Sequence, residues 1–207
     1  DEGGLSQRRE WNFPIDTLSL DYAHLESLDL PVSVVSVIQD RLLDVVFQDA
    51  FERTDWHVTE ENCDVMMSLD LGSVQVDGRE SQVSELELEL LSGEVERLIS
   101  LGCEVSECLP AFMGVISKAE RGDRLIRNAN PMDDPIAGTQ EHWLYWLSRA
   151  LDPLSGPAPD EAIRALQAVG DHEAIARYYD GLKRGDLPKG LASWMIMQSL
   201  ESMNAGS

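Results

Sequence analysis

Acidic residues and leucines alternate without interruption in the segment Ser84-Glu-Leu-Glu-Leu-Glu-Leu-Leu-Ser-Gly93. Because successive side chains of a β-strand point to opposite faces, this pattern predicts a strand with carboxylates on one face and leucines on the other. Glu85, Glu87 and Glu89 would then follow one another at about 6.6 Å, and such a row of charges needs compensation. The face is either solvated or an oxygen-ligand site for Mg²⁺ or Mn²⁺, which prefer anionic oxygens.

The composition of the 207 residues is strongly acidic. Thirty-eight acidic residues against sixteen basic ones give a net charge of −22, which argues against nucleic acid or an anionic membrane as a partner. The chain contains no apolar run long enough to span a membrane and no signal-peptide pattern at its start. Its three cysteines form no Cys-x-x-Cys pair, which favours a reducing compartment. We therefore expect a cytoplasmic protein.

Ten of the sixteen basic residues precede residue 132, and several fall on or near segments that we expect to be strands. Arg8 lies in the expected short strand 6–13 and Arg53 in the expected strand 51–59. A third basic group, Lys118, Arg121 and Arg124, is also placed on candidate strands. Basic and acidic residues that face one interior would compensate each other and could hold a polyanion together with a divalent cation, because Arg and Lys bind phosphate oxygens.

The remaining elements divide the chain into two regions. The sequence 128–135 is rich in turn-forming residues and predicts a boundary between domains 1–131 and 132–207. Hydrophobic periodicity predicts strands at 64–71, 73–76 and 84–93 and helices at 32–47, 93–108, 139–151, 159–169, 172–184 and 188–203. The aromatic residues of the second region, Trp143, Tyr145, Trp146 and Trp194, are expected to form the core of a small helical bundle.

The acid–leucine segment, with the sequence around it, resembles the C-terminal half of the CYTH domain, the fold of the triphosphate tunnel metalloenzymes. Within that family it is most similar to the bacterial inorganic triphosphatases. The resemblance covers residues 3–127 and rests on segments that occur in the family's order and spacing, namely Gly3–Asn12, Phe51–Val58, Ser68–Gly72, Ser84–Gly93 and Ser117–Gly122. It implies an α+β protein with an antiparallel β-tunnel and flanking helices, followed here by a small all-α region.

The resemblance also implies roles for individual residues. The tunnel of this family binds a triphosphate with Mg²⁺ or Mn²⁺ and hydrolyses a terminal phosphoanhydride bond. Metal binding is implied for Glu85 and Glu87 and, with weaker correspondence, for Glu89, Glu10 and Asp70. Substrate phosphate contacts are implied for Arg8, Arg53, Lys118 and Arg121, and of these Lys118 and Arg53 would be catalytic by stabilising charge on the transferring group.

Two departures from the family pattern matter. The opening Glu-x-Glu-x-Lys strand does not occur in this chain, and Asp55 stands where many relatives have a basic residue. We therefore expect the chain to lack N-terminal strands of the tunnel and to be inactive alone, the parent protein being the triphosphatase. The alternatives are a polyphosphate- or nucleotide-binding module without turnover, another CYTH activity (nucleoside or thiamine triphosphatase, adenylate cyclase), or a degenerate scaffold whose helical region 132–207 binds a partner.

Overall fold

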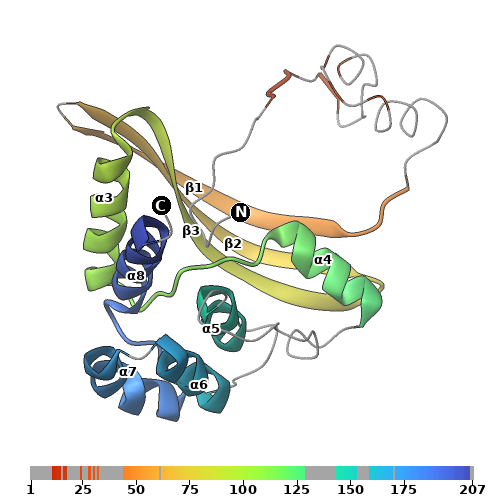
Figure 1. Cartoon of the computed structure of the whole chain (residues 1–207). Coiled ribbons are helices and arrows are strands. Elements are labelled where there is room, and N and C mark those ends of the chain that lie inside the picture. The colour runs from red at the N-terminus through yellow and green to blue at the C-terminus, as the bar shows by residue number, and fades with distance from the viewer. Residues whose placement is uncertain are drawn as a thin grey trace.

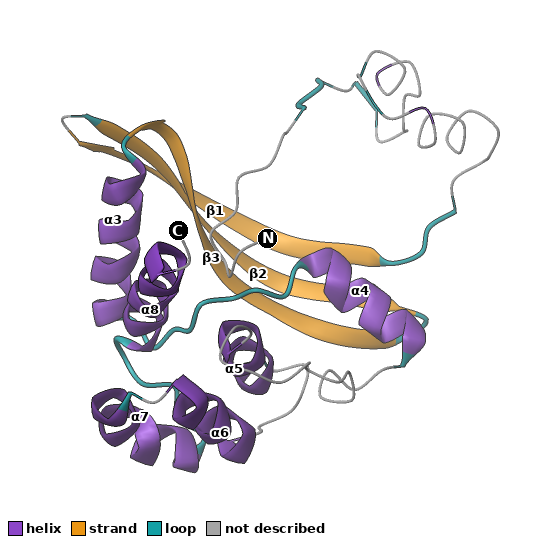
Figure 2. Cartoon of the chain, viewed as in Figure 1, coloured by secondary structure: helices purple, strands orange, loops and turns teal. Residues whose placement is uncertain are grey.

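The computed structural model describes residues 11–14, 16–17, 24, 28, 30, 32, 44–60, 62–128, 143–152, 159–169 and 171–205. Within these residues the chain is an α+β protein with one three-stranded sheet and six helices (Figures 1 and 2). The α+β class expected from the sequence is confirmed. The sheet is open over the described residues, so the closed tunnel stays a prediction.

The sheet is an antiparallel meander of β1 (Gln48–Glu60), β2 (Cys63–Val76) and β3 (Arg79–Gly93), in that spatial order. Its register aligns Arg53, Asp70 and Glu85 across the three strands. Directly opposed residues share a face, so these three side chains lie together, and we call their side of the sheet the charged face. The leucines of the acid–leucine segment take the opposite side, the leucine face, as its alternation predicted.

Glycine explains why two expected strands, 64–71 and 73–76, are one continuous strand. The sequence predicts a break at Gly72, but the structure places this residue inside β2, where a Cβ would lie 2.2 Å from the Ala50 carbonyl oxygen of β1. Glycine here permits a close approach of two backbones and does not end the strand. The turn that does end β2 is Asp77-Gly78, where both residues have positive φ, as the tight turns of hairpins require.

The close approach at Gly72 gives a stability prediction. We expect Gly72→Ala to lower the free energy of unfolding by about 2 kcal/mol or more, because the new methyl group would force β1 and β2 apart. Gly114→Ala is the matched control, since no atom lies within 4 Å of a Cβ built there. Equal stability of both variants in denaturant unfolding would show that β1 does not pack on Gly72 as described.

Two helices follow the sheet. The helix α3 (Val95–Cys108) covers one end of the leucine face, where its Leu101 lines a small pocket with Val58 and Val65. The helix α4 (Lys118–Arg127) lies along the charged face (Figure 1). The placement of Lys118, Arg121 and Arg124 on strands is therefore wrong.

The local sequence explains why this basic segment is helical. Ser117 is the N-cap of α4 and accepts a hydrogen bond from the Glu120 backbone N–H at 3.1 Å, while Asn128 ends the helix in the left-handed conformation. A Ser followed three residues later by Glu is the sequence signature of a capping box, and Asn is favoured at a left-handed helix end. These signals were present in the sequence and mark the element correctly.

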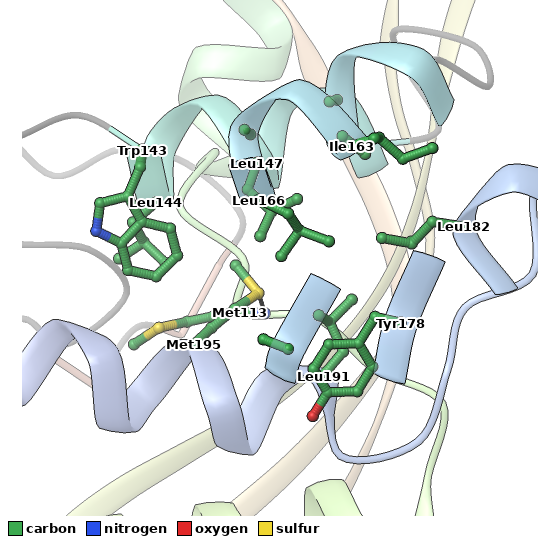
Figure 3. Packing of buried hydrophobic residues seen from close by; sticks show 14 residues of the cluster. Met113, Trp143, Leu144, Leu147, Ile163, Leu166, Tyr178, Leu182, Leu191 and Met195 are labelled. Atoms are coloured by element: carbon green, nitrogen blue, oxygen red, sulfur yellow. Dashed lines mark hydrogen bonds between the residues drawn. The ribbon is translucent and has the colours of Figure 1, made fainter. Parts of the chain in front are cut away.

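The helical region consists of α5 (Trp143–Leu151), α6 (Pro159–Val169), α7 (His172–Arg184) and α8 (Leu191–Ala205), which match the four helices expected there. Its core brings together residues from all four helices (Figure 3), among them Leu147, Leu166, Tyr178 and Met195. Trp143 is buried in this core, and Trp146 and Trp194 pack against it, as predicted. The fourth expected core residue, Tyr145, is not part of the core, because its hydroxyl bonds to Glu120 and Arg124 of α4.

The helical region is joined to the sheet region by direct contacts. Met113, which precedes the expected boundary near residue 131, is part of the helical core, and its backbone N–H lies 3.4 Å from the Met195 sulfur. Ser106 of α3 accepts the backbone N–H groups of Gly190 and Ser193 at 2.9 and 2.8 Å. The boundary itself stays a prediction, but the two regions share packing and hydrogen bonds.

Two other expected elements lie mostly outside the described residues. Of the expected strand 6–13, residues 11–13 are described and form no strand. Of the expected helix 32–47, residues 32 and 44–47 are described; residue 32 is helical and residues 44–47 are not.

Candidate functional site

Six charged side chains form a connected network on the charged face, and we call them the ion-pair cluster. The sheet contributes Arg53, Asp70, Glu85 and Glu87, and α4 contributes Lys118 and Arg121. Three cations thus meet three carboxylates. Register explains the sheet half of the cluster, because Asp70 pairs with both Arg53 and Glu85, while Glu87 follows Glu85 by two residues on the same face.

Asp70 is the buried centre of the cluster, with no solvent exposure. Arg53 donates two parallel hydrogen bonds to Asp70, from Nε to Oδ1 at 2.6 Å and from one Nη to Oδ2 at 2.7 Å. Lys118 Nζ lies 2.9 Å from Oδ2. The hydrogen bond from Arg53 outweighs burial and lowers the pKa of Asp70 from 3.8 to about 2. A buried carboxylate held this way is ionised at any physiological pH.

Lys118 connects the strand carboxylates. Its Nζ donates to Glu85 at 2.8 Å and to Glu87 at 3.1 Å. Burial alone would lower the pKa of Lys118, but its hydrogen bonds to Glu85, Asp70 and Glu87 outweigh burial and raise the pKa above its ordinary value. Lys118 is therefore a fixed ammonium. Its Nζ also lies 5.2 Å from the Phe51 ring centroid, within cation–π range.

Arg121 extends the cluster away from the sheet. One Nη lies 3.5 Å from Glu85, and its two Nη atoms bind both oxygens of Asp152 at 2.8 and 2.7 Å. Arg121 and Asp152 are both buried. Asp152 is not among the site residues expected from the sequence, although it follows Tyr145, Ser148 and Arg149 at the spacing i, i+3, i+4, i+7, and this polar side of a helix is a usable signal.

The structure joins five of the expected site residues and leaves others apart. Ion pairs link Arg53, Asp70, Glu85, Glu87 and Lys118 into one network, and Arg121 joins it through Glu85. Glu89 is exposed farther along β3 and takes no part in the network among the described residues. Arg8 and Glu10 lie outside the described residues, so their roles stay predictions.

Asp55 faces the cluster side of the sheet, as its spacing of two residues from Arg53 requires. Its carboxylate accepts a hydrogen bond from Ser68 at 2.7 Å, and Ser68 in turn pairs with Glu87 in the register. The charged face therefore carries a fourth sheet carboxylate close to Arg53. This acid would weaken attraction of a phosphate to that end of the cluster.

The ion-pair cluster contains two sets of potential ligands with opposite charge, three cationic side chains and three carboxylates. Arginine and lysine bind phosphate oxygens, and carboxylate oxygens suit hard divalent cations. In the described part of the chain no group of three or more His, Cys, Asp or Glu side chains is arranged as a metal site by itself. The reason is visible in the contacts: the carboxylates of Asp70, Glu85 and Glu87 are turned toward Lys118 and the arginines.

The fold and the cluster define the chain as an α+β protein with paired cations and carboxylates on one face of an antiparallel sheet. The chain is similar to the inorganic triphosphatase of Haemophilus influenzae, with 28% identity over 169 residues. The aligned region covers 77% of this chain and 41% of that relative, so the chain spans less than half of the relative's length. No protein-family model matches the chain. At this identity the similarity supports a distant relationship to a triphosphate hydrolase.

No helix in the described residues is both long and apolar enough to cross a bilayer. The three cysteines, one buried, one half-buried and one exposed, are free thiols, and none lies in the ion-pair cluster. Neither finding identifies a compartment, and the expected cytoplasmic location stays a prediction.

Proposed function

We propose that the protein to which this chain belongs hydrolyses inorganic triphosphate to pyrophosphate and phosphate in the presence of Mg²⁺ or Mn²⁺. The observation that carries the proposal is the ion-pair cluster, in which Arg53 and Lys118 meet Asp70, Glu85 and Glu87 on one sheet face. Support comes from the similarity to a protein named inorganic triphosphatase.

In this proposal the two halves of the cluster exchange partners when substrate binds. Arg53, Lys118 and Arg121 then bind the phosphate oxygens and hold the chain of phosphates in place, and Arg53 and Lys118 also stabilise charge on the terminal group. Glu85 and Glu87, released from Lys118, are the residues that would hold the divalent cation, and their anionic oxygens fit it. When bound, the metal would neutralise phosphate charge and lower the pKa of a water molecule. Arg53 keeps its two hydrogen bonds to Asp70 in this scheme, so the buried carboxylate is not left unpaired.

We further propose that additional strands complete the wall next to β1. All but one of the thirteen residues of β1 are exposed, and β1 is an edge of the sheet as described. A long exposed edge strand is a template for further pairing. The proposed neighbours are the segment that carries Arg8 and Glu10 and an opening acidic strand of the family pattern.

The proposed metal ligands are tested by Glu85→Gln and Glu87→Gln in the intact protein. We expect phosphate release from tripolyphosphate to fall about 100-fold or more in each, because an amide is a weaker metal ligand and lacks the charge that the site needs. Glu80→Gln on the same strand is the matched control, since Glu80 is exposed at the far end of β3. Unchanged turnover in both cluster variants would refute the metal role.

A second candidate function, polyphosphate or nucleotide binding without turnover, is favoured by one observation, the position of Asp55 on the charged face. Titration calorimetry separates the two functions. Tight tripolyphosphate binding by the intact protein, together with no phosphate release in the presence of Mg²⁺, would select the binding module. Nucleoside and thiamine triphosphates in the same assays distinguish the remaining activities of the family.

A further inference from the structure

The helix α5 has a polar stripe that faces away from the helical core. Tyr145, Ser148, Arg149 and Asp152 recur at the spacing i, i+3, i+4, i+7, which places them on one side of a helix. Ser148, Arg149 and Asp152 are all buried. Polar groups are buried when they have partners, so this stripe is expected to contact another polar surface.

That surface is α4 and the segment leading into it. Asp152, the residue after α5, binds both Nη atoms of Arg121. Tyr145 donates to Glu120 at 2.6 Å and accepts from Arg124 at 3.0 Å. Burial and the contact with Glu120 raise the pKa of Tyr145, so its hydroxyl stays protonated and can donate.

The loop before α4 is held from the same stripe. The Ser148 hydroxyl accepts the backbone N–H of Val115 at 3.2 Å, three residues before Lys118. The helix α4 therefore lies between two charged surfaces. On one side Lys118 and Arg121 reach the carboxylates of β3, and on the other side Arg121 and Arg124 are fixed by α5.

We propose that α5 positions the cations of the ion-pair cluster, with Asp152 as the principal positioning residue. Asp152 orients Arg121 so that one Nη is left facing Glu85 and an incoming phosphate, and the Tyr145 and Ser148 contacts fix the start of α4 where Lys118 is presented. The helical region would thus contribute to phosphate binding by positioning the cations of α4. This inference rests on the proposed function.

The geometry separates this role from catalysis. The carboxylate of Asp152 accepts hydrogen bonds from both Nη atoms of Arg121, so its proposed effect on substrate passes through Arg121. A buried carboxylate that fixes a guanidinium reduces the freedom the side chain would otherwise lose on binding. Removing it should weaken phosphate binding more than it slows the chemical step.

The test is the steady-state kinetics of Asp152→Asn in the intact protein with tripolyphosphate. We expect KM to rise about tenfold with kcat within about twofold, since a contact made equally to substrate and transition state acts on KM. Asp171→Asn is the matched control: Asp171 caps α7 and accepts from Trp194 in the helical bundle, with no described contact to α4. If Asp152 served only to stabilise the fold, Asp152→Asn would lower the fraction of active protein, as Asp171→Asn would, and kcat would fall in both variants without a change in KM.

Tyr145→Phe keeps the test decisive if Asp152→Asn fails to fold, because it removes one hydroxyl from the same stripe; we expect a smaller rise in KM, about threefold. Hydrogen exchange of the α4 amides gives a readout independent of turnover, and we expect faster exchange in Asp152→Asn and Tyr145→Phe than in Asp171→Asn. Unaltered KM together with unaltered α4 exchange would overturn the positioning role. If wild-type protein shows no hydrolysis or binding, the proposed function fails, while the exchange data still decide the contact between α5 and α4.

Discussion

Lys118→Met is expected to lower kcat/KM for tripolyphosphate by about 100- to 1000-fold, the loss typical of removing one preorganised donor from a developing charge. Lys118 contacts Asp70, Glu85 and Glu87 at 2.8 to 3.1 Å, so it connects all three carboxylates of the ion-pair cluster. Methionine keeps much of the volume of the side chain but supplies no charge. The substitution would therefore remove a cation from the phosphate and a counter-ion from the three carboxylates.

The measurement is phosphate release by the intact protein at saturating Mg²⁺, with thermal melting to verify that the variant is folded. Lys189→Met is the control, because Lys189 is an exposed lysine of the helical region away from the cluster. The Phe51 ring stays beside residue 118 in both proteins, so apolar packing is retained. Activity of Lys118→Met within threefold of the control would show that Lys118 is not part of the catalytic site.

Asp70→Asn is expected to cost about 2 kcal/mol of unfolding free energy, because it removes the buried carboxylate whose pKa the folded chain lowers from 3.8 to about 2. Arg53 and Lys118 would keep their charges and lose the carboxylate that Asp70 supplies without exposure to water. Asp64→Asn on the same strand is the control, since its side chain is 38% exposed and a loss below about 1 kcal/mol is expected there. Denaturant unfolding at neutral pH measures the difference.

The same residue predicts a pH dependence. Its pKa is about 2 in the folded chain against 3.8 ordinarily, so the unfolded chain binds the proton first as pH falls. The stabilisation from Asp70 is therefore complete above about pH 4 and lost between about pH 4 and pH 2, amounting to about 2 kcal/mol. In Asp70→Asn the unfolding free energy should not show this decrease between about pH 4 and pH 2. An identical decline of stability in both proteins over that window would contradict the role of Asp70.

The sequence predicted the sheet half of the site because the signals there are local. Alternation of acid and leucine over 85–90 identified a strand, and spacing of two residues placed Glu85 and Glu87 on one face. The helices at 159–169 and 172–184 were predicted with the bounds that the structure gives them. In each case the period of the hydrophobic pattern matches the geometry of the element.

The other half of the site depends on contacts that no local pattern contains. Lys118 reaches Glu85 from a helix thirty-three residues later, and the interpretation as a strand passed over the Ser117–Glu120 capping signal. The pairing of Arg121 with Asp152 joins two elements separated by the expected domain boundary. Turn-rich composition predicts an interruption of secondary structure, but it does not predict which side chains on either side of the interruption contact each other.

The central claim, that the ion-pair cluster is a metal-dependent triphosphate site, is tested most directly by phosphate release from tripolyphosphate by the intact wild-type protein. The account predicts equal amounts of phosphate and pyrophosphate when Mg²⁺ or Mn²⁺ is present, and loss of both products on chelation of the metal. No release with either metal, or release that persists at the same rate after chelation, would contradict it.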